Sequence, residues 1–131
     1  MALKDDIQKL ITGEILDDDE TLKKYSRDSS IFEIRPTIVI FPKNSEDIKA
    51  IVNYVNQNKD LSITVRSAGT DMSGAAIGES IILDVSKYIN KLININEDSA
   101  IVQPGMLYKD FEKETLKHNL LLPTYPASRE L

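Results

Sequence analysis

Cysteine is absent from the 131 residues of this chain, and histidine occurs only once. Without cysteine, the protein forms neither disulfides nor thiolate metal sites. No apolar run approaches the roughly 18 residues that would suggest a membrane span. The N-terminus also lacks the basic start and the apolar stretch of a signal peptide. These absences predict a soluble, cytoplasmic protein with no transmembrane segment.

Basic residues are fewer than acidic ones. The chain has 16 Lys and Arg and 21 Asp and Glu, which gives a formal net charge of −5. Binding to a phosphate backbone depends on a basic surface, so nucleic acid is not an expected partner. The acidic run at residues 17–20 suits the start of a helix. Consecutive carboxylates without a histidine beside them do not predict a metal site.

A loop of small residues follows the alternating apolar positions of residues 61–65. Glycines at 69 and 74 permit positive φ angles and a close approach to the backbone, and consecutive amides can form an anion-binding concavity. We therefore expect the loop to hold a diphosphate, with Asp71 turned outward or capping the following turn. Such a segment can also be a plain connection. The candidate residues are Arg66, Ser67, Ala68, Gly69, Thr70, Asp71, Ser73 and Gly74.

Two better-known phosphate loops do not match this segment. The Walker loop needs Lys and then Ser or Thr after its second glycine, whereas Ala75 and Ala76 follow Gly74. The dinucleotide fingerprint needs a Gly-x-Gly-x-x-Gly spacing that this chain lacks. Nucleotide hydrolysis and nicotinamide binding are therefore not expected.

Hydrophobic periodicity predicts an α+β fold. A leading helix over residues 3–11 comes first, and a β-α-β unit follows, with its helix capped by Asn44 or Ser45. Another strand, an antiparallel hairpin and a final helix complete the pattern. The expected ranges are strands at 38–41, 61–65 and 81–85, hairpin strands at 92–96 and 100–103, and helices starting near 45 and 107.

With these motifs, the chain resembles the flavin domain of the vanillyl-alcohol oxidase and p-cresol methylhydroxylase (PCMH) superfamily. The resemblance rests on the glycine loop and on its order among weaker motifs, and it covers roughly residues 25–131. Segments at 25–30 and 120–128 are similar to the branch that contains D-lactate and glycolate dehydrogenase-type enzymes. The supporting motifs are RPTIVIFP at 35–42, SEDI at 45–48, ILD at 82–84 and VQPG at 102–105.

This resemblance implies an FAD-binding PCMH-type domain. It implies that residues Arg66 to Asp71, with Ser73 and Gly74, surround the pyrophosphate of FAD, while Pro104 and Gly105 approach the cofactor by their backbone. Some members attach FAD through a histidine in this loop, but this chain has Ala68-Gly69-Thr70 there. The implied cofactor is non-covalent FAD. The implied reaction is oxidation of a small 2-hydroxy acid by hydride transfer to flavin, with the electron acceptor left open.

We expect residues 1–30 to form a helical lead-in and residues 31–131 to form the first part of an FAD-binding domain, truncated at its C-terminus. The catalytic residues would then lie beyond Leu131, so the fragment alone should be inactive and should bind FAD weakly. His118 is not assigned a catalytic role, because no Ser, Cys or Asp is placed to form a triad with it. The alternatives are a non-catalytic module with a structural loop, or a flavin reductase of peptidoglycan precursors.

Overall fold

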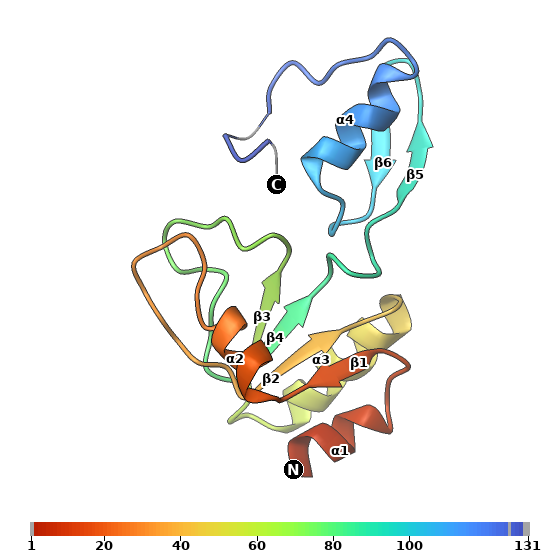
Figure 1. The fold of residues 1–131 in the computed structure, drawn as a ribbon. Coiled ribbons are helices and arrows are strands. Elements are labelled where there is room, and N and C mark those ends of the chain that lie inside the picture. The colour runs from red at the N-terminus through yellow and green to blue at the C-terminus, as the bar shows by residue number, and fades with distance from the viewer. Residues whose placement is uncertain (1, 126, 130–131) are drawn as a thin grey trace.

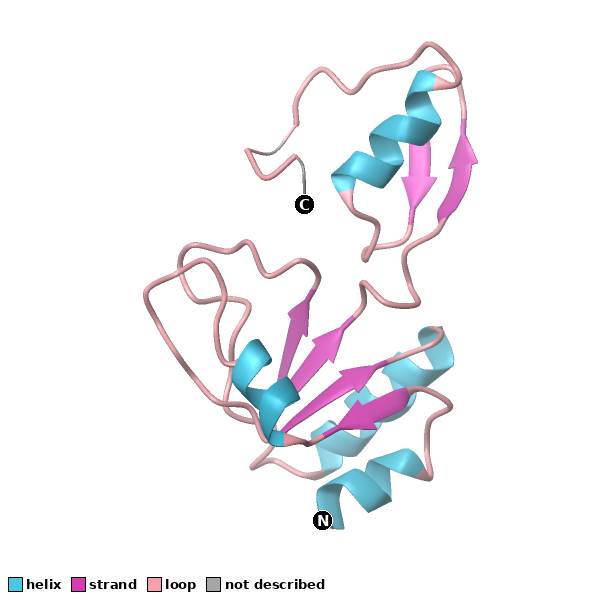
Figure 2. Cartoon of the chain, viewed as in Figure 1, coloured by secondary structure: helices cyan, strands magenta, loops and turns pink. Residues whose placement is uncertain are grey.

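A computed structural model describes residues 2–125 and 127–129 of the chain. It contains a four-stranded sheet with helices on both faces, followed by a two-stranded hairpin with one helix (Figures 1 and 2). Pro126, Glu130 and Leu131, which belong to the C-terminal segment of the resemblance, lie outside the described residues. The elements are α1 (Ala2–Gln8), β1 (Glu14–Leu16), α2 (Asp19–Tyr25), β2 (Ile38–Phe41), α3 (Ser45–Gln57), β3 (Ile63–Arg66), β4 (Ile81–Asp84), β5 (Leu92–Ile95), β6 (Ala100–Val102) and α4 (Tyr108–Leu116).

The strands of the larger sheet lie in the order β1-β2-β4-β3. β2 and β3 each pair with β4 in parallel, so Ile81 is the register partner of both Ile38 and Ile63. The predicted β-α-β unit is therefore present, but β4 lies between its two strands. β1 adds an antiparallel edge to β2. β1 was not among the predicted strands, because three residues are too few for a periodic signal. The mixed pairing confirms the α+β prediction.

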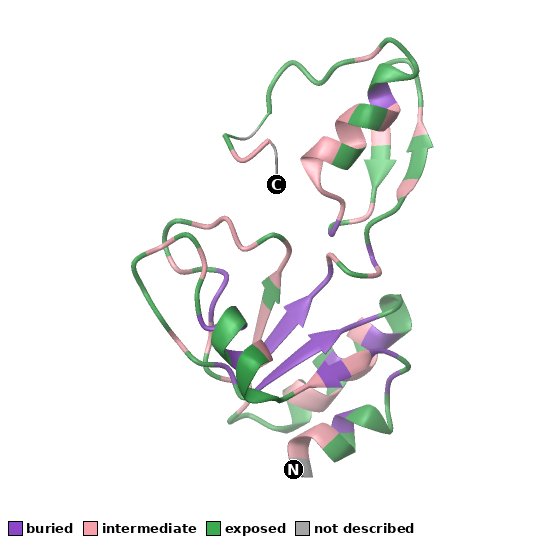
Figure 3. Cartoon of the chain, in the orientation of Figure 1, coloured by how far each residue is buried: buried purple, intermediate pink, exposed green. Residues whose placement is uncertain are grey.

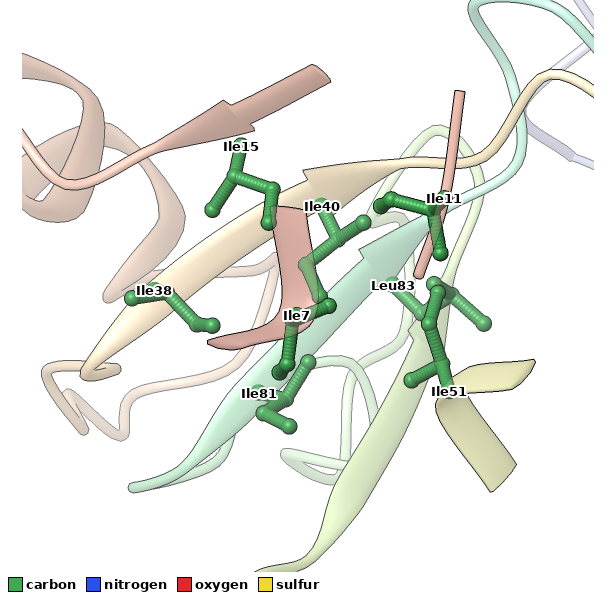
Figure 4. Packing of buried hydrophobic residues seen from close by; sticks show 8 residues of the cluster. All are labelled: Ile7, Ile11, Ile15, Ile38, Ile40, Ile51, Ile81 and Leu83. Carbon is green, nitrogen blue, oxygen red and sulfur yellow. The ribbon is translucent and has the colours of Figure 1, made fainter. Parts of the chain in front are cut away.

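The core lies on both faces of the sheet, which explains why every residue of β2 and β4 is buried (Figure 3). α1 and α3 cover one face, and α2 covers the other (Figures 1 and 4). Strands buried on both faces read as continuous apolar runs, as the sequence of β2 does. The first face holds Ile7, Ile11, Ile15, Ile38, Ile40, Ile51, Ile81 and Leu83, and the second holds Leu22, Tyr25, Val39, Phe41 and Ile82. Residues of the lead-in thus share a core with the sheet.

The acidic run at residues 17–20 starts a helix, as predicted. The side chain of Asp18 caps α2 by accepting a hydrogen bond from the N–H of Thr21 at 2.9 Å. At α3, the carboxamide of Asn44 accepts from the N–H of Asp47, which confirms the first of the two predicted caps. No helix in the described ranges is long and apolar enough to cross a membrane.

Asp47 connects the start of α3 to the turn after α1. Asp47 is 3% exposed, and its carboxylate accepts hydrogen bonds from the N–H groups of Thr12 and Lys43, each at 2.9 Å. The Thr12 hydroxyl lies 3.2 Å from both carboxylate oxygens. Thr12 belongs to the lead-in and Lys43 follows β2, and both donate to the same carboxylate. Asp47 therefore holds the lead-in against the sheet.

We predict that Asp47→Ala lowers the free energy of unfolding by about 1 to 3 kcal/mol, because it leaves two partly buried N–H groups without acceptors. Urea denaturation followed by circular dichroism measures the change. Asp6→Ala is the matched control, since Asp6 forms only an exposed ion pair with Lys9 and such pairs contribute little. Equal losses in the two variants would contradict this account of Asp47.

The hairpin unit follows the sheet and has the predicted antiparallel form, with a register irregularity between Leu92 and Asn94. It is joined to the turn after β4 by backbone hydrogen bonds from Gln103 N to Lys91 O, at 2.8 Å, and from Gly105 N to Ile89 O, at 2.8 Å. α4 starts one residue after the predicted position and runs to Leu116. The hairpin and α4 therefore begin at the edge where β3 and β4 end.

Candidate glycine-loop site

The glycine loop, residues 67–76, leaves the carboxyl end of β3 and forms neither helix nor strand. Gly69 has φ 72° and Gly74 has φ 90°, which confirms the expected positive angles. Residues with side chains rarely adopt this conformation, so both positions require glycine for backbone reasons alone. The loop lies at the strand ends of a parallel sheet, which is where ligands of open α/β sheets bind.

The first amides of the loop are free donors. Within the described residues, the N–H groups of residues 67–70 have no hydrogen-bond acceptor. Backbone N–H groups that the protein leaves without partners are suited to binding an anion, since consecutive amides concentrate positive partial charge. Residues 67–70 therefore fit a diphosphate as donors. That residues 67–73 all face one cavity stays a prediction.

Asp71 turns its carboxylate into the loop, in agreement with the expected cap. One carboxylate oxygen accepts from the N–H of Ser73 at 2.8 Å, from the hydroxyl of Ser73 at 2.9 Å and from the N–H of Ala75 at 2.8 Å. The hydrogen bond from Ala75, followed by those from Ser73, lowers the pKa of Asp71. Ser73 uses its donors on this carboxylate. Its own place in a cofactor site stays a prediction.

Arg66 lies beneath the loop at the end of β3. Its Nη1 donates to the carbonyl oxygen of Arg27 at 2.7 Å and to that of Ala76 at 3.4 Å. Its Cζ lies 5.0 Å from the centre of the Tyr25 ring. A Cβ placed on Gly69 would be 2.3 Å from Nη2 of Arg66, so the glycine backbone rests directly on the guanidinium group.

Tyr25 and Asp84 form a buried pair next to Arg66. The tyrosine hydroxyl donates to one carboxylate oxygen of Asp84 at 2.6 Å, and the other oxygen accepts from the N–H and hydroxyl of Ser86. Burial, and then the hydrogen bond to Asp84, raise the pKa of Tyr25, which keeps the phenol protonated. Sequence reasoning did not assign this pair to the site. The position of Asp84 could have indicated it, because Asp84 is a charged residue at the carboxyl end of β4, the strand that pairs with β3.

Pro104 and Gly105 lie where the hairpin returns to the sheet. Gly105 is buried, and a Cβ added to it would be 2.1 Å from the carbonyl oxygen of Val85. The N–H of Val85 in turn donates to the carbonyl oxygen of Arg66 at 3.0 Å. Gly105 packs closely against the backbone of Val85, just after β4. The glycine loop begins at the neighbouring end of β3. A contact of Pro104 or Gly105 with a cofactor stays a prediction.

Two cavities in the described part of the chain are lined by residues of the hairpin, α4 and the segment after it. One cavity of about 280 Å³ opens between the hairpin and α4, and it includes no residue of the glycine loop. Its lining is mostly apolar, with Ile95, Phe111, Thr115, Leu120, Leu121, Leu122 and Pro123 among the lining residues. The glycine loop is distinguished by its free amides.

Comparison with known proteins places the chain in a family. The sequence profile of an FAD binding domain matches residues 36–131. The chain is 30% identical over 132 residues to a D-2-hydroxyglutarate dehydrogenase of Stutzerimonas stutzeri, which covers 97% of this chain and 28% of that protein. It is 32% identical over 133 residues to the glycolate oxidase subunit GlcD of Escherichia coli, covering 98% of this chain and 26% of that protein.

Solved structures give the same result for the fold. p-Cresol methylhydroxylase with substrate bound superposes with a TM-score of 0.82 at 22% identity, over 98% of this chain and 27% of that one. 6-Hydroxy-D-nicotine oxidase of Arthrobacter nicotinovorans has a TM-score of 0.69 at 27% identity, over 82% of this chain and 24% of that one. The chain spans between 24% and 28% of the length of these four proteins.

These matches confirm the resemblance to PCMH-type flavoproteins and to the branch of D-lactate and glycolate dehydrogenase-type enzymes. Relatives of this chain are dehydrogenases and oxidases, so they support an oxidoreductase. The profile match covers well over half of the chain and includes the complete glycine loop. The chain belongs to the FAD binding domain family whose profile matches residues 36–131.

Proposed function

We propose that this chain binds FAD non-covalently, with the diphosphate against the backbone of the glycine loop, as part of an enzyme that oxidises a 2-hydroxy acid. The observation that carries the proposal is the set of free N–H groups at residues 67–70, at the carboxyl end of β3. Hydrogen bonds to charged groups contribute about 1.5 to 3 kcal/mol each. Several aligned amides can therefore bind an anion although the chain carries a net charge of −5.

The protein's part in this function is to bind and orient. Residues 67–70 donate to the diphosphate, and Arg66 adds a positive charge close to the loop. Asp71 turns its negative charge toward Ser73 and Ala75, and so reduces its repulsion of the phosphates. No histidine lies in the loop, which supports a non-covalent cofactor. Flavin, when bound, supplies the hydride acceptor.

The substrate class rests on relatives alone. The names of the relatives include D-2-hydroxyglutarate, D-lactate and glycolate, all of which are 2-hydroxy acids. Their shared chemistry is a carboxylate next to a carbon that carries a hydroxyl and a hydrogen. We propose a small molecule of this class as the substrate of the protein that contains this domain.

Titration of the ¹⁵N-labelled chain with FAD tests the proposed site. We expect the amide signals of residues 67–70 to shift with FAD and with inorganic diphosphate. Riboflavin, which has the flavin ring but no phosphate, should leave these signals in place. Because backbone amides report the contact directly, the test needs no turnover. Shifts confined to other segments, or none with FAD at high concentration, would contradict the proposal and favour a structural loop.

A further inference from the structure

The glycine loop is held from behind by the segment 25–33, which precedes the family match at residues 36–131. In Figure 1, the orange chain after α2 lies beside the green loop after β3. The main contact is the hydrogen bond from Arg66 Nη1 to the carbonyl oxygen of Arg27 at 2.7 Å. The same nitrogen lies 3.4 Å from the carbonyl oxygen of Ala76. One guanidinium group therefore links both ends of the loop to the segment 25–33.

Two further contacts connect the same pair of segments. The carboxylate of Asp28 accepts from the N–H of Ala76 at 3.4 Å, and its other oxygen accepts from the N–H of Ser30 at 2.9 Å. A Cβ built on Gly74 would lie 3.0 Å from Cδ2 of Phe32, which places the phenylalanine ring against the loop backbone. The segment 25–33 thus contacts the loop near its start, at its second glycine and at its end.

The position of Arg66 is itself fixed by the core. Its guanidinium group packs on the Tyr25 ring, and Tyr25 is 8% exposed and hydrogen-bonded to Asp84. An arginine presents planar, fixed donors that stack on an aromatic ring, whereas a lysine presents one flexible ammonium group. The two residues are therefore not equivalent at this position. Arginine alone can stack on Tyr25 and bond to the Arg27 carbonyl in the observed geometry.

A loop with two glycines loses much conformational freedom when it is ordered. Ordering before the ligand arrives removes that cost from the binding step. We infer that Arg66 is a positioning residue, which holds the glycine loop in its diphosphate-accepting shape through the carbonyls of Arg27 and Ala76. The hydrogen bonds of Arg66 contribute more to FAD affinity than its positive charge does. This inference rests on the proposed function, and it assigns the segment 25–33 to the cofactor site.

The test compares Arg66→Lys, which keeps the charge, with Arg66→Ala, which removes it. Arg35→Ala is the matched control, because Arg35 pairs with Asp19 on the surface. Amide hydrogen exchange of residues 67–76 is measured on the cofactor-free chain. FAD affinity is then measured by fluorescence titration. We expect both Arg66 variants to exchange faster and to bind FAD about tenfold more weakly, since each loses the carbonyl hydrogen bonds.

The two readouts separate this inference from the proposed function. Wild-type exchange and wild-type FAD affinity in Arg66→Lys would overturn the inference and leave charge as the role of Arg66. Faster exchange in Arg66→Lys, with no change in Arg35→Ala, supports the positioning role even in a chain that binds no FAD. Absence of FAD binding by the wild-type chain would overturn the proposed function only.

Discussion

Gly105→Ala is expected to lower the free energy of unfolding by about 3 kcal/mol or more, which is the upper end of the range for overpacked sites. The added methyl carbon would be 2.1 Å from the carbonyl oxygen of Val85 and 2.7 Å from that of Ile89. Both atoms belong to the backbone, so no side-chain rotation relieves the contact. The hairpin must move away from the sheet, or the turn after β4 must distort.

Urea denaturation of purified Gly105→Ala, with circular dichroism as the signal, measures the loss. Gly78→Ala is the control, because a Cβ at Gly78 meets the side-chain oxygen of Thr64 at 2.4 Å, and a side chain can rotate. We expect a clearly smaller loss in the control. If Gly105→Ala unfolds at the same urea concentration as the wild type, the close packing of the hairpin on Val85 does not exist in solution.

Gly69→Val is expected to reduce FAD affinity by about 100-fold, because the loss of two charge-assisted hydrogen bonds has about this effect. A side chain at φ 72° is strained, and its Cβ would be 2.3 Å from Arg66. Strain of this kind costs about 1 kcal/mol or more. The valine would also displace the Arg66 guanidinium on which the loop backbone rests, and so move the amides of residues 67–70 out of their phosphate-accepting positions. The loss in affinity should therefore exceed the loss in stability.

Fluorescence titration with FAD and urea denaturation, on the same preparations, separate the two effects. Ile51→Val is the matched control, because it removes one methyl group from a fully buried core position and costs about 0.5 to 1.5 kcal/mol. This variant loses stability without touching the loop, and it should keep its affinity. Proportional losses in both variants would mean that Gly69 acts through stability alone.

Local signals in the sequence predicted most of the elements. Pro36 and Pro42 bound β2, Asn44 caps α3, and alternation marks β3, so each of these features was visible within a few residues. The positive φ angles of Gly69 and Gly74 and the capping of the following turn by Asp71, one of the two expected alternatives, were also predicted correctly. Each depends on backbone sterics or on hydrogen bonds between near neighbours, which a sequence records directly.

Features that depend on distant residues could not be predicted in this way. Insertion of β4 between β2 and β3 depends on the pairing of Ile81 with both strands, and no local pattern encodes that order. Arg66 was assigned to the diphosphate by its position in the loop motif. Its hydrogen bond to the Arg27 carbonyl joins residues 39 positions apart, so only a folded chain reveals it. Gly105 likewise gains its close contact with Val85 from tertiary packing.

The central position of β4 also sets the order in which the chain can assemble. During synthesis, β2, α3 and β3 leave the ribosome before β4, but β2 and β3 have no direct pairing with each other. Their facing edges stay open until Asp84 has been added, which exposes the nascent chain to wrong pairing. Asp84 is the register partner of Arg66 and accepts the hydrogen bond of Tyr25, on which Arg66 packs, so the support of the glycine loop is complete only at that moment. If FAD binds as proposed, it would bind after the sheet is complete and would not start the assembly of the sheet.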